Sequence, residues 1–223
     1  MKKIIIALVL VCSISAFAQK TIEREIGEFS TVKVYDLINL KMYKSDVNKV
    51  VVAGDNKDDV QIINKNGKLK IRMILEESYD GEDTVVKLYY TSVDVVDANE
   101  GAKVTFNEPI EQYEIDFKTQ EGAEITAEIK TTYANFRAVT GGEIYVTGSS
   151  KNQDISIYTG GVFNGEEFIT ENTEVSISAG GEAYVYATEY ADIRIKAGGD
   201  VYIYGKPKEV DEKRVFGGRI KRM

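Results

Sequence analysis

A pair of adjacent glycines recurs through the second half of the chain at a nearly constant interval. The steps between successive pairs are 19, 20 and 18 residues. The pairs are Gly141-Gly142, Gly160-Gly161, Gly180-Gly181 and Gly198-Gly199. Gly101-Ala102 and Gly122-Ala123 extend the series toward the N-terminus in a weaker form. A period near twenty, with strand-like segments on each side, is typical of stacked coils rather than of a domain around one central core.

Apolar residues occupy equal offsets on both sides of each glycine pair. One offset after the pairs holds Ile144, Phe163, Ala183 and Val201, and one offset before them holds Ala138, Ile157, Ile177 and Ile195. Because side chains alternate along a strand, each coil is predicted to contain two short strands with inward apolar residues, joined by a glycine corner. One coil buries roughly four apolar side chains, at about 2 kcal/mol each. Ordering its backbone costs about 1–2 kcal/mol per residue, so a coil is stable only in a stack.

The pattern predicts an all-β fold, a single-stranded β-solenoid with coils of about 20 residues. We divide it into N-terminal strands over residues 19–90, repeat coils over 91–205 and a C-terminal tail over 206–223. Asn66-Gly67 lies between two apolar runs, which predicts a tight hairpin. The tail departs from the period, and we expect it to cap the last coil, with a basic docking tail as the alternative. The glycines follow no phosphate-binding pattern, so we interpret them as corners.

Residues 1–18 have the pattern of an export signal. Lys2 and Lys3 precede an apolar run, and Ala16-Phe17-Ala18 forms a small-residue cleavage site. The run is about half the length needed to cross a bilayer. We therefore expect an exported protein with no membrane span after the signal is removed.

Composition excludes several kinds of chemistry. The chain has no histidine, and its one cysteine, Cys12, lies in the predicted signal. Imidazole acid–base catalysis, Ser-His-Asp and Cys-His nucleophiles and ordinary zinc sites are therefore excluded. Removal of Lys2 and Lys3 moves the formal charge from -8 to -10, which argues against a nucleic-acid partner. We expect no cofactor.

Tyrosines are predicted to line up on the outside of the later coils. The outward positions that follow the glycine pairs hold Tyr145, Tyr184, Tyr186, Tyr202 and Tyr204. Coils stack about 4.8 Å apart, so Tyr184 should stack on Tyr202 and Tyr186 on Tyr204. Such a surface suits sugar rings or a protein partner, and these five tyrosines are our candidate ligand-binding residues. The alternative is that tyrosine merely favours exposed strand positions.

Two columns of polar and acidic side chains accompany the tyrosines. One column holds Glu143, Glu182 and Asp200, and the other holds Asn135, Asp154, Glu174 and Asp192. Neighbouring like charges repel by roughly 1 kcal/mol in water, which a bound calcium ion could relieve. One carboxylate per coil supplies too few ligands for calcium, so we expect solvated columns and no metal site. Arg137, Arg194 and Lys196 are the expected charge partners.

Several motifs, taken in order, resemble a known family. They are Ile26–Val34, Val50–Asp55, Asn66–Ile71, Thr140–Ile144, Ala197–Val201 and Tyr204–Val210. In this order they resemble the family of putative auto-transporter adhesins with a head GIN domain (DUF2807), which is common in Bacteroidetes. The resemblance implies a right-handed β-helix in the cell envelope without established catalytic residues. Residues 161–165 depart from the family pattern through an extra glycine, so we expect an irregular coil there.

The sequence leaves three functions open. The first is a non-catalytic, adhesin-like envelope protein that presents a solenoid face to glycan or protein, in the periplasm or on the surface of a Gram-negative bacterium. The second is a structural protein that assembles with copies of itself. The third is a carbohydrate-active β-helix enzyme, for which a pair such as Glu182 and Asp200 could meet the carboxylate spacing. The coils are too short to wall off a cleft, which argues against the third.

Overall fold

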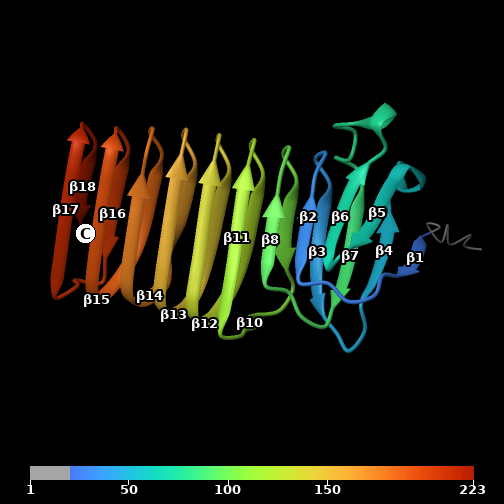
Figure 1. The fold of residues 1–223 in the computed structure, drawn as a ribbon, viewed down its shortest axis with the longest axis horizontal. Helices are drawn as coiled ribbons and strands as arrows, with labels where there is room; N and C mark the ends of the chain where they lie inside the picture. Colours follow the sequence, from blue (N-terminus) through green and yellow to red (C-terminus); the bar gives the residue numbers. More distant parts are fainter. Residues whose placement is uncertain (1–20) are drawn as a thin grey trace, which may run out of the picture.

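The computed structural model describes residues 21–223, which form an elongated β-solenoid of about seven turns (Figure 1). The predicted export signal, residues 1–18, lies outside this range. The described residues contain strands and two short 3₁₀ turns, Lys57–Asp59 and Leu75–Glu77, but no α-helix. The predicted all-β solenoid with coils of about 20 residues is thus confirmed.

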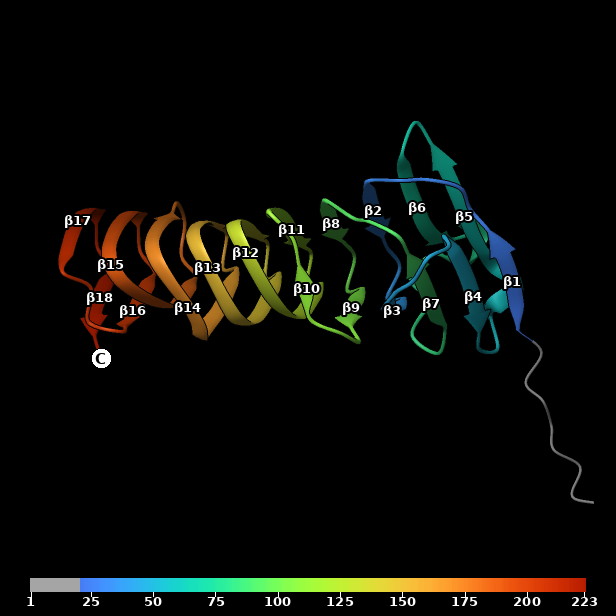
Figure 2. The same ribbon diagram turned by 90° about the horizontal axis from the view of Figure 1, so that it is seen from below.

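Four long strands make up the middle of the repeat. They are β12 (Glu124–Val139), β13 (Glu143–Tyr158), β14 (Val162–Ile177) and β15 (Glu182–Ala197). Each strand runs from one glycine corner to the next and pairs in parallel with its neighbour. The expectation of two short strands per coil is wrong here, because the chain bends opposite the glycine corner without ending the strand (Figure 2).

The two glycines of a corner serve different purposes. At the corner after β12, Thr140 and Gly141 have φ angles of 50° and 71°, and the Gly142 N–H donates to the Val139 carbonyl at 3.0 Å. Two consecutive left-handed residues define a type I′ turn, for which glycine carries no steric penalty. A Cβ atom on Gly142 would lie 2.7 Å from backbone atoms of Thr119 in the adjoining coil. The first glycine therefore permits the turn, and the second permits two coils to approach closely.

The N-terminal part is built from shorter strands. They are β1 (Ile22–Glu25), β2 (Thr31–Val34), β3 (Asn39–Lys44), β4 (Lys49–Ala53), β5 (Val60–Lys65), β6 (Lys68–Met73), β7 (Val85–Tyr90), β8 (Val95–Ala98) and β9 (Lys103–Phe106). β10 (Ile110–Glu111) and β11 (Glu114–Gln120) then lead into β12. β2 pairs in parallel with both β6 and β8, and β3 with both β7 and β9. The coil β2–β3 is therefore inserted between two coils that come later in the chain.

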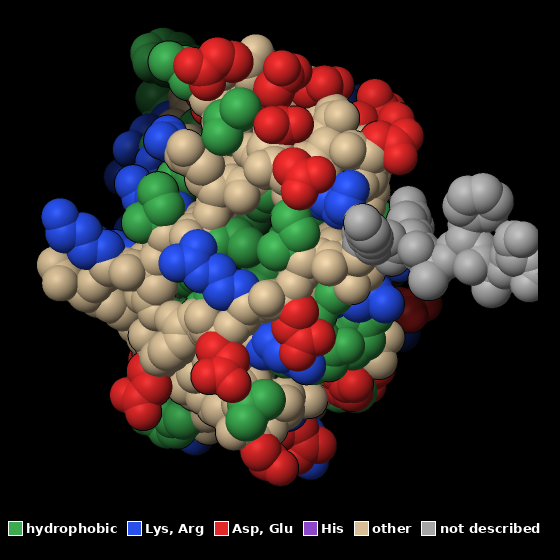
Figure 3. Space-filling model, turned by 90° about the vertical axis from the view of Figure 1, so that its right-hand side faces the viewer, with side chains coloured by type: hydrophobic (Ala, Val, Ile, Leu, Met, Phe, Trp, Pro, Cys, Tyr) green, Lys and Arg blue, Asp and Glu red, His purple; other side chains and the backbone are tan. Residues whose placement is uncertain are grey.

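Antiparallel strands close the N-terminal end of the solenoid. β4 pairs with β7, β1 pairs with β4, and β5 pairs with β6. The β5–β6 hairpin turns at Asn66 and Gly67, whose φ angles are 52° and 72°, so the predicted tight hairpin is confirmed. Figure 3, which views this end, shows hydrophobic side chains near its middle with charged side chains around them.

The C-terminal end keeps the repeat. β16 (Asp200–Tyr204) follows β15, and β17 (Glu209–Phe216) and β18 (Arg219–Arg222) form one more coil in register with β15 and β16. Gly217 and Gly218 make its corner, both with positive φ. The expectation that residues 206–223 depart from the period is therefore wrong, since the C-terminal corner repeats the 19-residue step.

The last coil differs from the others in what it directs inward. Glu212 and Arg214 pair in register with buried Ile193 and Ile195, and Arg222 pairs with buried Ile203. Glu212 and Arg222 form an ion pair at 2.9 Å. Charged side chains thus replace apolar ones at the open end of the core, which is the arrangement expected of a solenoid cap.

The core is a continuous column of apolar side chains along the solenoid axis. Phe106, Phe117, Phe136 and Phe163 follow one another with ring centroids 5.7, 6.0 and 4.7 Å apart. Aromatic pairs at such distances add about 0.5–1.5 kcal/mol beyond their buried area. These phenylalanines lie on β9, β11, β12 and β14, and their ring contacts therefore hold together the coils from β9 to β14.

One coil is irregular, as the extra glycine predicted. The register of β14 shifts against β13 between Tyr145 and Gly148, and against β15 between Gly165 and Ile169. Phe168 is fully buried beyond the bulge, and a Cβ on Gly165 would lie 2.6 Å from the Phe163 ring. The bulge therefore leaves no room for a side chain at Gly165.

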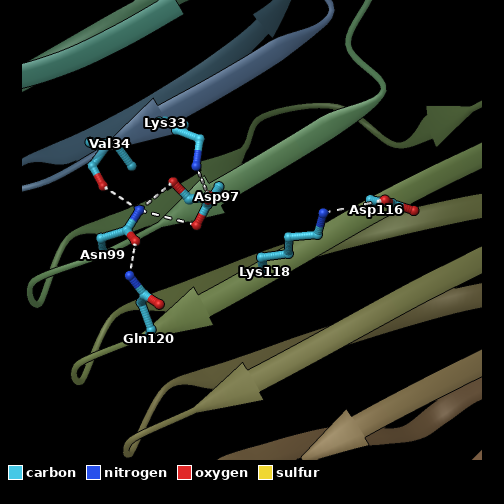
Figure 4. Close-up of polar contacts among 7 residues, drawn as sticks. All are labelled: Lys33, Val34, Asp97, Asn99, Asp116, Lys118 and Gln120. Carbon is cyan, nitrogen blue, oxygen red and sulfur yellow. Dashed lines mark hydrogen bonds and ion pairs between the residues drawn. The ribbon is translucent and has the colours of Figure 1, made fainter. Parts of the chain in front are cut away.

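Polar side chains join the inserted coil to the repeat (Figure 4). Lys33 of β2 and Asp97 of β8 form an ion pair at 2.5 Å. Asn99 donates to the Val34 carbonyl at 3.4 Å and accepts from Gln120 Nε2 at 2.5 Å. These contacts link β2 through β8 to β11, across three neighbouring rungs.

Candidate functional site

The five candidate tyrosines lie on one outer sheet of the solenoid. We call this set the tyrosine face: Tyr145, Tyr184, Tyr186, Tyr202 and Tyr204. They come from the first halves of β13 and β15 and from β16, close to the glycine corners, and all are half-buried. Alternation places them outward because their sequence neighbours Val146, Val185 and Ile203 point into the core.

Tyr184 and Tyr202 stack as predicted. Their ring centroids are 4.6 Å apart and the ring planes differ by 5°. Lys221 of the last coil places its Nζ 5.2 Å from the Tyr202 ring centroid, which is a cation–π contact. Neighbours on successive coils thus occupy both faces of the Tyr202 ring and leave its edge and hydroxyl to solvent.

Tyr186 and Tyr204 pair in register, but the expected ring stack between them is not among the aromatic contacts of residues 21–223. The Tyr186 ring lies instead over Gly205, where an added Cβ would be 2.4 Å from a ring carbon. Desolvation and then a hydrogen bond with Glu166, on the β14 bulge, raise the pKa of Tyr204. The prediction of a second stack was therefore wrong, because glycine opens a closer surface for the Tyr186 ring.

Carboxylates of the first acidic column hold the hydroxyls of this face. Tyr184 Oη donates to Glu182 Oε2 at 2.8 Å, and Tyr145 Oη donates in the same way to Glu143 Oε2. These hydrogen bonds are the largest cause that raises the pKa of both tyrosines to about 12. Two acids that we expected to be merely solvated therefore fix the tyrosine side chains.

Asp200, the third member of that column, has a different partner. The Arg219 guanidinium donates from Nε to Asp200 Oδ1 at 2.8 Å and bonds the second carboxylate oxygen through Nη2. The hydrogen bond from Arg219 is the largest influence on this carboxyl and holds its pKa below the usual value. The pair links β16 to the last coil. Glu182 and Asp200, the catalytic pair considered above, therefore each already accept a hydrogen bond from a neighbouring side chain.

The second column also forms in register. Asn135, Asp154, Glu174 and Asp192 are direct partners on successive coils. Arg194 pairs with Asp192, as expected, with Nε 3.1 Å from Oδ1. Arg137 lies over the Tyr158 ring at 4.6 Å, a contact that the expectation of acid partners missed. Across residues 21–223, no group of three or more His, Cys, Asp or Glu side chains is placed to hold a metal ion.

A hollow of about 350 Å³ adjoins the tyrosine face. Tyr145, Asn164 and Glu166 line it, together with Thr147 and Glu128. Sequence reasoning missed the hollow because it depends on the bulge that displaces Glu166 and Glu167 from the regular register. Gly165 was the available signal. The face and hollow together offer ring edges, hydroxyls, an amide and carboxylates, which suit binding through hydrogen bonds and van der Waals contact.

A model of the putative auto-transporter adhesins with a head GIN domain (DUF2807) matches residues 28–207. The chain belongs to this family. Among curated proteins, none matches it.

Solved structures share this adhesin-family fold. A putative adhesin from Bacteroides fragilis aligns with a TM-score of 0.84 at 14% identity, covering 92% of this chain and 96% of that one. A putative adhesin from Parabacteroides distasonis gives a TM-score of 0.74 at 16% identity, with the same coverage. A putative lipid binding protein from the same species gives 0.68 at 16% identity, again with 92% and 96% covered. At such identities the likeness concerns the fold.

Within the part of the chain that the structure describes, no helix is long and apolar enough to cross a bilayer.

Proposed function

We propose that this family member is an exported, non-catalytic adhesin-like protein of the cell envelope, which binds a partner through the tyrosine face. The family match and the adhesin-named structural neighbours support the proposal. The observation that carries it is the Tyr184–Tyr202 stack, whose rings are held by Glu182 on one side and Lys221 on the other. Such a preordered aromatic patch loses little side-chain entropy on binding.

Of the two partner classes, the geometry of this face favours protein over glycan. A sugar ring packs against the open face of an aromatic ring, whereas neighbours occupy both faces of the Tyr202 ring. The exposed ring edges and hydroxyls match the way tyrosine contributes to protein interfaces, with apolar area beside a hydrogen-bonding group. The adjoining hollow beside Tyr145 provides a place for one protruding side chain of the partner.

A pull-down from isolated cell envelopes tests this function. The variant carries Tyr184→Ser and Tyr202→Ser, and we expect it to retain the fold and lose most of the captured protein. The matched control carries Tyr43→Ser and Tyr89→Ser, because that pair also stacks, at 5.3 Å and 24°, but belongs to β3 and β7 at the other end of the solenoid. Equal capture by the two double variants would refute a binding role for the tyrosine face.

Self-assembly through the same face is the alternative, and the oligomeric state separates the two. The mature chain and the Tyr184→Ser, Tyr202→Ser variant are compared by sedimentation velocity. An oligomer that dissociates in the variant, with envelope capture unchanged, would replace the partner-binding function by self-assembly.

A further inference from the structure

A second hollow lies across several coils, on the side of the solenoid opposite the glycine corners. It has a volume of about 280 Å³ and lies at the bend of the long strands β12 to β15. We call it the corner groove, lined by Tyr133, Asn152, Asp154, Asn172, Glu174 and Tyr190. The tyrosine face contributes no residue to it.

The groove runs along the solenoid axis. Tyr133, Asn152, Asn172 and Tyr190 are direct register partners on four successive coils. Three rung spacings of about 4.8 Å place the two tyrosines about 14 Å apart. The hollow exists because two short asparagines stand between two large rings. Its length suits a short linear chain of sugar rings.

The tyrosine rings at the two ends are fixed and open toward a ligand. Tyr113 supports Tyr133 with ring centroids 5.5 Å apart and planes tilted by 59°, while 42% of Tyr133 remains exposed. Tyr190 Oη donates to Asp211 at 2.8 Å, which anchors that ring from the neighbouring coil. Among the aromatic contacts of residues 21–223, Tyr190 has none and Tyr133 has only the tilted contact with Tyr113. Within residues 21–223, neither ring is held between an aromatic ring and a cation as Tyr202 is.

The sides of the groove present oriented hydrogen-bonding groups. Asn172 Nδ2 donates to Asn152 Oδ1 at 3.0 Å, and Asn152 Nδ2 donates to the Thr132 carbonyl at 3.3 Å. The amide column is therefore held in one orientation before any ligand arrives. Two residues further along the same strands, the second acidic column supplies Asp154 and Glu174, which as carboxylates only accept hydrogen bonds.

We propose that the corner groove binds a neutral oligosaccharide aligned with the solenoid axis. Tyr133 and Tyr190 contact sugar rings at the two ends, where an aromatic face packs against apolar C–H groups. Asp154 and Glu174 accept hydrogen bonds from hydroxyl groups, and the asparagine amides complete the set. An anionic sugar is disfavoured because Asp154, Glu174 and the neighbouring Asp192 and Asp211 form an unbroken acidic line.

Binding of defined hexasaccharides to the mature chain tests the proposal. The neutral probes are maltohexaose, cellohexaose and β-1,4-mannohexaose, and the charged comparisons are hexagalacturonate and the glucosamine hexamer. We expect at least one neutral probe to bind at millimolar concentration or below in isothermal titration, with amide NMR shifts that cluster at residues 133, 152, 172 and 190. Absence of binding by all three neutral probes, or preference for a charged hexamer, overturns the proposal.

Variants locate the site. Tyr133→Ala and Tyr190→Ala should each weaken binding about tenfold, the effect of losing one aromatic contact. Tyr133→Phe should bind like the natural protein, since the ring rather than the hydroxyl makes the contact. The double variant Tyr184→Ser, Tyr202→Ser should leave the affinity for hexasaccharide unchanged. A loss of envelope capture in that variant can therefore be told apart from a loss of oligosaccharide binding at the corner groove. Unchanged affinity in Tyr133→Ala, with NMR shifts elsewhere, would move the site away from the groove.

Discussion

The repeat from β11 onward and the N-terminal part before it build similar rungs from different chain connections. In the repeat, each residue pairs with one 17 to 21 positions away, as Ile144 does with Phe163 at 19. In the N-terminal part, β2 pairs with strands far along the chain on both sides, and Lys33 bonds Asp97 across 64 positions. Long-range pairing requires larger loops to close before contacts form. Two rungs can therefore have the same structure although the chain must close loops of different length to form them.

The largest effects come from truncating buried side chains in each part. Phe163→Ala in the repeat should lower the free energy of unfolding by about 3–5 kcal/mol, and Leu40→Ala in the inserted coil by about 2–5 kcal/mol. Because the core is one continuous column, urea unfolding followed by circular dichroism should show a single transition for both. Two separate transitions would show that the parts fold independently.

The corner of the inserted coil has Leu37 where the repeat has a glycine, and the residue before it is the buried acid Asp36. Asp36 has φ 58°, and its carboxylate accepts from the Met73 N–H at 3.0 Å and the Tyr79 N–H at 3.2 Å. Asp36→Ala should cost about 1–3 kcal/mol, because two partly buried donors lose their acceptor. Asp36→Asn keeps one acceptor and should cost less in the same urea titration. Equal costs would indicate that charge, rather than hydrogen bonding, stabilises this corner.

The glycine corners of the repeat give a smaller, graded effect. Gly142→Ala should destabilise by about 1–3 kcal/mol, since the new Cβ meets the Thr119 backbone at 2.7 Å. Gly141→Ala meets no atom within 4 Å and should cost about 1 kcal/mol, from its φ of +71° alone. Thermal unfolding of the two variants measures the difference. If Gly141→Ala were the more destabilising of the two, the turn conformation rather than the close approach of the coils would be the reason that glycine is needed at this corner.

The smallest effect lies where the two parts meet. Desolvation, and then the nearby Asp36, raise the pKa of Glu100 above its ordinary value of 4.5. The folded state thus binds this proton more tightly than the unfolded state, so the contribution of Glu100 to stability falls as pH rises from 4.5 through the folded pKa. Glu100→Gln should stabilise by a few tenths of a kcal/mol at pH 7, given solvent screening. The gain should vanish near pH 4, and a gain that persisted there would rule out titration as its cause.

The repeat was predictable because its evidence is local. Equal offsets around the glycine pairs set the register, and that register alone predicted the Tyr184–Tyr202 stack. The ring direction of Tyr186 was not predictable, since it depends on the open space at Gly205. The inserted coil was hidden for another reason. Nothing in the residues of β2 shows that both of its neighbours come later in the chain.

The corner groove was within reach of sequence reasoning. Tyr133, Asn152, Asn172 and Tyr190 are separated by 19, 20 and 18 residues, which are the same steps as the glycine pairs. This offset lies two residues before the acidic column that begins at Asn135, whereas the candidate tyrosines were taken only from positions after the glycines. The groove's position at the bend of the long strands, however, could not be predicted, because the expectation of two separate strands did not include that bend.

The two ends of the rod are closed in different ways, antiparallel strands at one and inward charges at the other. Neither closure depends on how many coils lie between them. Duplication of one 19-residue unit in the gene would therefore lengthen the molecule by about 4.8 Å while both closures stay intact. Proteins of this fold can therefore differ in length by whole coils, without a change at either terminus.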